Sequence, residues 1–98
     1  MTMIKLEFVQ DLVPVENFLG LKKSTEYLIV KNNTDIGVLE AYINDSEIYI
    51  FHVRLDEEFQ KHGYFKKWLK EQNKKVIALW PTVAAKKYWT EVADEIIF

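Results

Sequence analysis

The sequence contains no cysteine, and only three glycines and two prolines occur among its 98 residues. The lack of cysteine excludes a disulfide framework, a thiolate nucleophile and a cysteine-ligated zinc site. Little glycine and proline, together with 49% hydrophobic residues, is typical of a packed domain and not of a disordered segment. A chain of this length supports one hydrophobic core, so we expect a single domain over residues 1–98.

Long apolar runs and an excess of positive charge are also missing. No apolar run approaches the roughly 18 to 20 residues that span a bilayer, and no basic stretch with an apolar core opens the chain. We therefore expect a cytoplasmic protein with no membrane partner. Thirteen basic and fifteen acidic residues give a net charge of -2, which does not favour nucleic acid. The two histidines have no carboxylate at ligand spacing, so no metal site is expected.

Hydropathy patterns and turn residues predict elements in the order β-α-β-β-β-α-β-α-β. They comprise strands near residues 4–10, 27–30, 36–43, 47–55, 76–80 and 96–98, and helices near 12–19, 64–72 and 83–93. Asp11 is expected to cap the first helix and Thr82 the last. Three consecutive antiparallel strands and a strand–helix–strand crossover predict an α/β fold of the α+β kind. Its central sheet is mixed and mostly antiparallel, parallel at one point, with helices able to cover both faces.

One loop joins the longest predicted strand to the following amphipathic helix, and it reads Gln60-Lys61-His62-Gly63-Tyr64-Phe65. At such a position, backbone N–H groups and the helix dipole both favour an anion. The loop therefore predicts a site for the pyrophosphate of a nucleotide-like cofactor. An ordinary strand-to-helix turn containing a glycine is the alternative interpretation.

These motifs and their order resemble the GNAT superfamily of N-acetyltransferases from about residue 26 to the C-terminus. The family loop R/Q-x-x-G-x-G/A is matched at Gln60 and Gly63. The family's upstream V-x-P-x-Y resembles Leu55-Asp56-Glu57-Glu58-Phe59, which keeps the apolar and aromatic ends without the proline. The downstream A-x-x-F-Y-x-K-x-G-F resembles Ala85-Lys86-Lys87-Tyr88-Trp89-Thr90-Glu91-Val92-Ala93-Asp94.

The resemblance implies a GNAT-like domain that takes acetyl-CoA as cosubstrate and transfers its acetyl group to an amine. By position, the pantetheine arm would meet Val53, Arg54, Leu55 and Thr82, and the pyrophosphate would meet Gln60, Lys61, His62, Gly63, Tyr64 and Phe65. The reaction needs a base for the amine proton and an acid for the leaving thiolate. Tyr88 is the candidate acid, and His52, Tyr49 and Glu47 are candidate bases. Each also has a structural alternative, as a packed strand residue or a core aromatic.

The sequence departs from the family pattern at several positions. Phe65 replaces a small residue, Thr82 replaces an asparagine, and Trp89 stands where the family has its acid tyrosine. These departures leave open a rival interpretation, a GNAT-like binding or regulatory module that has lost acetyl transfer. The interval between the first two strands holds one short helix where the family has two. That shortage predicts an open sheet edge and a homodimer that completes the site.

Overall fold

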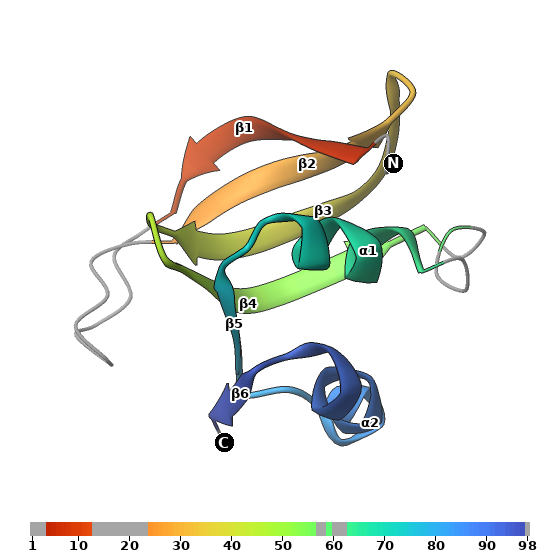
Figure 1. Cartoon of the computed structure of the whole chain (residues 1–98). Helices are drawn as coiled ribbons and strands as arrows, with labels where there is room; N and C mark the ends of the chain where they lie inside the picture. The colour runs from red at the N-terminus through yellow and green to blue at the C-terminus, as the bar shows by residue number, and fades with distance from the viewer. Residues whose placement is uncertain (1–3, 13–23, 57–58, 60–62, 98) are drawn as a thin grey trace.

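The computed structural model describes residues 4–12, 24–56, 59 and 63–97 (Figure 1). Its elements are β1 (Ile4–Asp11), β2 (Thr25–Lys31), β3 (Thr34–Ile43), β4 (Glu47–Leu55), α1 (Tyr64–Glu71), β5 (Lys75–Leu79), α2 (Val83–Val92) and β6 (Glu95–Ile97). The predicted helix near residues 12–19 lies almost wholly outside the described residues. Each of the other predicted elements is present, with bounds that differ by a few residues.

The six strands form one sheet in the order β1-β2-β3-β4-β5-β6. The first four strands are antiparallel neighbours, whereas β4–β5 and β5–β6 are parallel pairs. The predicted α+β class with a mixed, mostly antiparallel sheet is therefore confirmed. The prediction of a single parallel point was wrong, because the chain crosses over a second time through α2 and places β6 beside β5.

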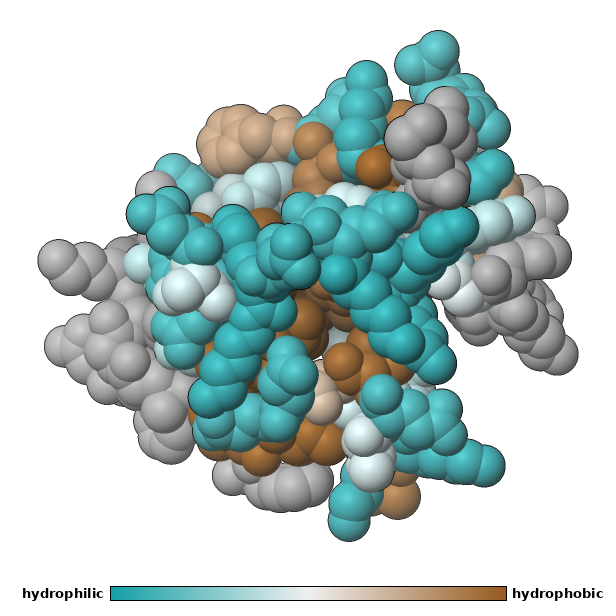
Figure 2. Space-filling view, in the orientation of Figure 1, coloured by the Kyte–Doolittle hydropathy of each residue, from teal (hydrophilic) through white to brown (hydrophobic). Residues whose placement is uncertain are grey.

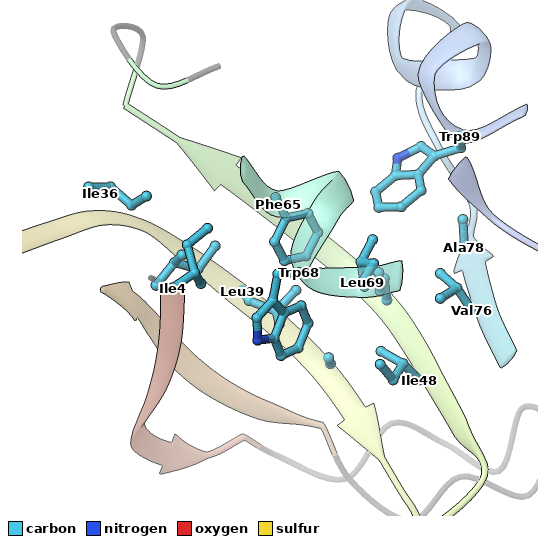
Figure 3. Packing of buried hydrophobic residues seen from close by; sticks show 13 residues of the cluster. Ile4, Ile36, Leu39, Ile48, Phe65, Trp68, Leu69, Val76, Ala78 and Trp89 are labelled. Atoms are coloured by element: carbon cyan, nitrogen blue, oxygen red, sulfur yellow. The ribbon is translucent and has the colours of Figure 1, made fainter. Parts of the chain in front are cut away.

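Both described helices pack on the same face of the sheet (Figure 3). The main core contains Phe65, Trp68 and Leu69 from α1 together with Trp89 from α2. On the opposite face, the smaller cluster around Ile77 and Leu79 contains no helical residue of the described chain. Of the helices expected to be able to cover both faces, α1 and α2 cover one, and the first predicted helix lies almost wholly outside the described residues. Both crossovers advance in the same direction along the sheet, so a common handedness places both helices on one side.

Local sequence signals account for the ends of several elements. Asn32 and Asn33 both have positive φ, 51° and 64°, as a two-residue turn between β2 and β3 requires. Thr82 caps α2 as predicted, because its hydroxyl oxygen accepts a hydrogen bond from the Ala85 N–H at 3.2 Å. Asp11 ends β1, and its carboxylate accepts a hydrogen bond from the Thr25 hydroxyl at 2.9 Å. The helix that Asp11 was expected to cap lies outside the described residues.

Candidate functional site

The pairing of β4 with β5 ends about halfway along β4, one residue before β5 itself ends. Their parallel pairing runs from Glu47 opposite Lys75 to Ile50 opposite Ala78. Strand β4 continues to Leu55, so its second half borders an opening on the side of β5. We call this opening the β4–β5 gap.

A β-bulge in β4 lies at the point where the gap begins. Ala41 pairs with Ile50 and Glu40 pairs with His52, which leaves Phe51 as the extra residue. A bulge bends its strand and increases the local twist, and this favours the separation of β4 from β5.

Close approach of β3 keeps the second half of β4 in the sheet. A Cβ atom at Gly37 would meet the Arg54 carbonyl oxygen and would come within 2.9 Å of the Leu55 Cα. The lack of a side chain at Gly37 is therefore what lets β3 approach β4 so closely beside the gap.

The backbone N–H and C=O groups of Val53 point into the gap. The Asp56 N–H donates to the Ile36 carbonyl oxygen at 2.7 Å, and the register places Leu39 opposite Val53. Backbone groups of alternate residues in an antiparallel ladder point toward the same neighbour. Arg54 therefore shares the β3-facing direction of Asp56, and the N–H and C=O of Val53 point the other way. One donor and one acceptor thus face the space that β5 has left.

Two adjoining cavities occupy the gap and share Val53, Ala85 and Trp89 in their walls. The larger, of about 330 Å³, also has walls from Arg54, Leu55, Phe65 and Tyr88. The smaller, of about 190 Å³, includes Phe51, His52, Leu79, Trp80 and Thr82. Because Phe51 and Leu79 belong to one face of the sheet and Trp89 to the other, the smaller cavity passes through the sheet plane.

Tyr88, the candidate acid, lies in the wall of the larger cavity. Its ring meets the Trp89 ring edge to face, with centroids 4.9 Å apart. Although 38% of the Tyr88 surface is exposed, partial burial of its hydroxyl raises the pKa of the phenol above its ordinary value. The phenol is therefore protonated at neutral pH, which is the state that a proton donor needs.

The three candidate bases lie in different places. Glu47 begins β4 and lines neither cavity of the gap. His52 lies in the wall of the smaller cavity and faces Glu40 across the β3–β4 ladder. Tyr49 packs on the opposite face of the sheet with Tyr42, at 6.0 Å between ring centroids, and lines neither cavity of the gap. Burial, followed by a hydrogen bond to Glu47, raises the pKa of Tyr49. The fold thus brings His52 and Tyr88 to the gap and separates Tyr49 from both.

The predicted phosphate loop is described only at its helical end, because Gln60, Lys61 and His62 lie outside the described residues. Gly63 is the N-cap of α1 with φ 70°, and no side chain of the described residues caps the helix there. Phe65 is 2% exposed and its ring stacks on Trp68, with centroids 5.6 Å apart. The large residue at position 65 is explained by the core, which its side chain fills beneath the helix. Tyr64 is half-buried against the edge of the main core, and the Lys31 ammonium lies 4.7 Å from its ring centroid.

Several wall residues were not singled out from the sequence as site residues. Phe51 lines the smaller cavity as the extra residue of the bulge, and no clear signal in the sequence predicts that bulge. Trp80 has φ 47° and follows β5 directly, and the pair Trp80-Pro81 at the end of an apolar strand is a usable signal. Ala85 belongs to the apolar stripe of its helix, and its small size keeps both cavities open.

A larger hollow, of about 700 Å³, lies elsewhere, at the C-terminal ends of α1 and α2. Its rim carries both charge signs, with Lys70 and Lys74 from one side and Glu91 and Asp94 from the other. The Asp94 carboxylate already accepts a hydrogen bond from the Val76 N–H at 2.8 Å. Figure 2 shows hydrophilic side chains over much of this view, with apolar surface in the hollow between them. None of the predicted site residues lines this larger hollow, so the gap is the stronger candidate.

Other site classes find no support in the part of the chain that the structure describes. There, no three His, Asp or Glu side chains gather closely enough to hold a metal ion. Among the described helices, none is long and apolar enough to cross a membrane.

The sequence matches no protein-family model and no curated protein. Among solved structures, the chain is similar to a GNAT-family acetyltransferase from Streptococcus pneumoniae TIGR4, with a TM-score of 0.45 and 16% identity over 91% of this chain and 85% of the other. It is also similar to an aminoglycoside acetyltransferase from an uncultured soil metagenomic sample, solved with sisomicin and with trehalose. Those two structures give TM-scores of 0.42 and 0.41 at 15% identity, over 97% of this chain and 76% of the other. Likenesses at these scores carry no conclusion about activity, which has to come from the geometry of the gap.

Proposed function

We propose that this protein binds acetyl-CoA in the β4–β5 gap and transfers its acetyl group to an amine. The observation that carries the proposal is the parting of β4 from β5, which leaves the N–H and C=O of Val53 facing an apolar cavity. The pantetheine arm of CoA is an extended chain with two amide groups. Such a chain pairs with a strand edge in the way that an added strand does.

The remaining walls of the gap suit the other parts of the cofactor. Leu55, Phe65 and Trp89 offer apolar surface to the alkyl segments of the arm. Arg54 is exposed beside the cavity, where a cation favours phosphate. The N-terminus of α1 at Gly63, which no described side chain caps, favours the pyrophosphate. In this proposal Gln60, Lys61 and His62 continue the phosphate site, and the Thr82 oxygen contacts the arm.

The proposed reaction is direct transfer. The amine nitrogen attacks the thioester carbonyl carbon, a C–N bond forms, and the C–S bond breaks to release the CoA thiolate. His52 takes the proton that the amine loses, and the Tyr88 phenol donates a proton to the thiolate. A backbone N–H of β4 facing the gap polarises the carbonyl oxygen. We assign no step to Tyr49, because its ring lies outside the walls of the gap.

In this proposal, the two cavities of the gap bind the two substrates separately. The larger cavity, on the helix-covered face, receives the acyl donor. The smaller cavity leads through the sheet to Phe51, His52 and Trp80, and the amine enters from there. The aromatic rings of Phe51 and Trp80 suit a cationic amine, since an ammonium group is attracted to an aromatic face.

A matched pair of helix variants tests cofactor binding. Ala85 lines both cavities, whereas its neighbour Ala84 is exposed on the same helix. Acetyl-CoA is titrated while the fluorescence of the tryptophans and the melting temperature are followed. At 100 times its dissociation constant, a ligand stabilises the folded state by about 2.7 kcal/mol. We expect Ala85→Leu to abolish the response and Ala84→Leu to keep it. No response of the unmodified protein at millimolar acetyl-CoA would exclude the proposal.

The second candidate is a module that binds acetyl-CoA without chemistry. The observation in its favour is Trp89, which is 6% exposed and occupies the position where the resemblance expects the acid tyrosine. Release of free CoA, measured with a panel of amines, distinguishes the two functions. Acceleration by any amine supports transfer, whereas saturable binding without acceleration supports the module.

A further inference from the structure

The two edge strands of the sheet differ in length and in the side chains that they expose. Strand β6 has three residues, whereas β1 has eight and pairs with β2 on one side only within the described chain. Phe8 is 65% exposed and Val9 is 43% exposed. A long edge strand with exposed apolar side chains is a template for pairing with another chain.

From Ile4 to Phe8, the side chains of β1 alternate between the two faces of the sheet; beyond Phe8, an irregularity at Val9 shifts the register with β2. Ile4 belongs to the main core and Leu6 packs against it. Because successive side chains in a strand point to opposite faces, Phe8 shares their face, and Lys5 and Glu7 lie on the other. Both charged side chains are exposed.

Symmetry limits the ways in which β1 can pair with a second β1. A two-fold axis perpendicular to the sheet keeps each face on its own side, so one residue must lie opposite its own copy. Centring the axis on Lys5 would oppose two lysines, and centring it on Glu7 would oppose two glutamates. Centring it on Leu6 places Lys5 opposite Glu7 of the second copy, twice, and places Ile4 opposite Phe8. Of these three registers, only the one centred on Leu6 pairs opposite charges and covers the exposed Phe8.

From this complementarity we infer that two copies of this chain form a homodimer through antiparallel pairing of β1 with β1 in the register centred on Leu6. The pairing continues the sheet across both copies and hydrogen-bonds the outer edge of β1. It also buries the exposed Phe8 ring against the edge of the partner's core.

This interface lies at the far end of the sheet from the β4–β5 gap, since β1 and β6 are opposite edges. Each copy keeps its own gap open, and no residue of the second copy enters it. This dimer therefore differs from the homodimer expected from the sequence, because it does not complete the site. The inference does not depend on the proposed acetyl transfer, and its test uses no cofactor.

Charge exchange tests the register. Sedimentation equilibrium of the full chain is expected to show a monomer–dimer equilibrium. Lys5→Glu and Glu7→Lys each turn two attractive cross-strand pairs into repulsive ones, and each should raise the dimer dissociation constant by roughly tenfold or more. The double variant Lys5→Glu/Glu7→Lys restores opposite charges and should recover the original constant. Circular dichroism and thermal melting at low concentration check that each variant is folded.

Three results would overturn the inference. They are a monomer at millimolar concentration, equal dissociation constants for all four proteins, or a double variant weaker than both single ones.

Cross-linking provides a second measurement, since the chain has no cysteine of its own. The variant Lys5→Cys/Glu7→Cys should be captured as a covalent dimer by a short thiol cross-linker. The matched control is Lys67→Cys/Lys70→Cys, which places two thiols at exposed positions of α1, away from β1. Equal capture of the two variants would count against the register.

Discussion

Ile50 and Ala78 are the last residues that pair β4 with β5. Beyond them the bulge at Phe51 bends one strand, and the positive φ of Trp80 marks the turn that follows the other. The opening between the two strands is the feature around which Val53, His52 and Tyr88 come together.

Gly37→Ala should destabilise the fold and disturb the gap at the same time. The added methyl group would press on the backbone of Arg54 and Leu55, which cannot rotate away as a side chain could. Overpacking of this kind costs roughly 1–3 kcal/mol. Urea unfolding measures the loss, and the acetyl-CoA titration measures the effect on the gap. Unchanged stability would show that β3 and β4 are not held as closely as the structure places them.

Substitution of Gly63 should destabilise the protein because of its backbone conformation and not because of steric crowding. A Cβ atom there would meet nothing within 4 Å, but the φ of +70° is unfavourable for residues with a side chain. We expect Gly63→Val to cost about 1 kcal/mol or more and Gly63→Asn to cost less, because asparagine tolerates this conformation. If the α1 N-terminus binds the pyrophosphate, Gly63→Val should also weaken acetyl-CoA binding. Equal affinity of both variants and the unmodified protein would place the phosphate elsewhere.

Tyr88→Phe tests the role of the phenol as acid. The ring and its contact with Trp89 are kept, so acetyl-CoA affinity should change little. Loss of a general acid typically lowers the rate about 10²–10⁴-fold. The measurement is kcat for CoA release beside the acetyl-CoA dissociation constant. A kcat that is unchanged would remove Tyr88 from the reaction, and a lost affinity would make it a binding residue.

Stability should fall at alkaline pH. Burial raises the pKa of Tyr49 and Tyr88 in the folded protein above the value of 10.0 that an unperturbed tyrosine has. The hydrogen bond and charge of Glu95 likewise raise the pKa of Lys75, which forms an ion pair with Glu95 at 2.9 Å. The unfolded chain therefore loses these protons first, and the stabilisation present below about pH 10 is lost as the pH rises through the folded pKa values.

Urea unfolding at about pH 8 and again above about pH 10 measures this decline. Tyr49→Phe should reduce it, because phenylalanine keeps the packing and has no proton to lose. Tyr42→Phe is the matched control, as Tyr42 packs against Tyr49 on the same face. An equal decline in Tyr49→Phe and in the unmodified protein would show that other groups govern the alkaline transition.

Local patterns in the sequence determine most of the elements. Alternation of apolar and polar residues gives β1, and continuous apolar runs give β2 and β4. The asparagine pair gives the turn between β2 and β3, and Thr82 gives the start of α2. These signals can be recognised because each depends on residues that are neighbours in the chain. The α+β class follows from their succession along the chain.

Tertiary structure alone decided the features that make a site. Whether β4 and β5 separate depends on pairing between Ile50 and Ala78 and on one extra residue at Phe51, and nothing local distinguishes a bulged strand from a regular one. The face that α1 and α2 share follows from the direction of two crossovers. That shared face places Phe65, Ala85 and Trp89 around the same opening and leaves Tyr49 behind the sheet. Residue types therefore identify Tyr49, His52 and Tyr88 equally as candidates. Only packing between distant segments decides which of them lie at the gap.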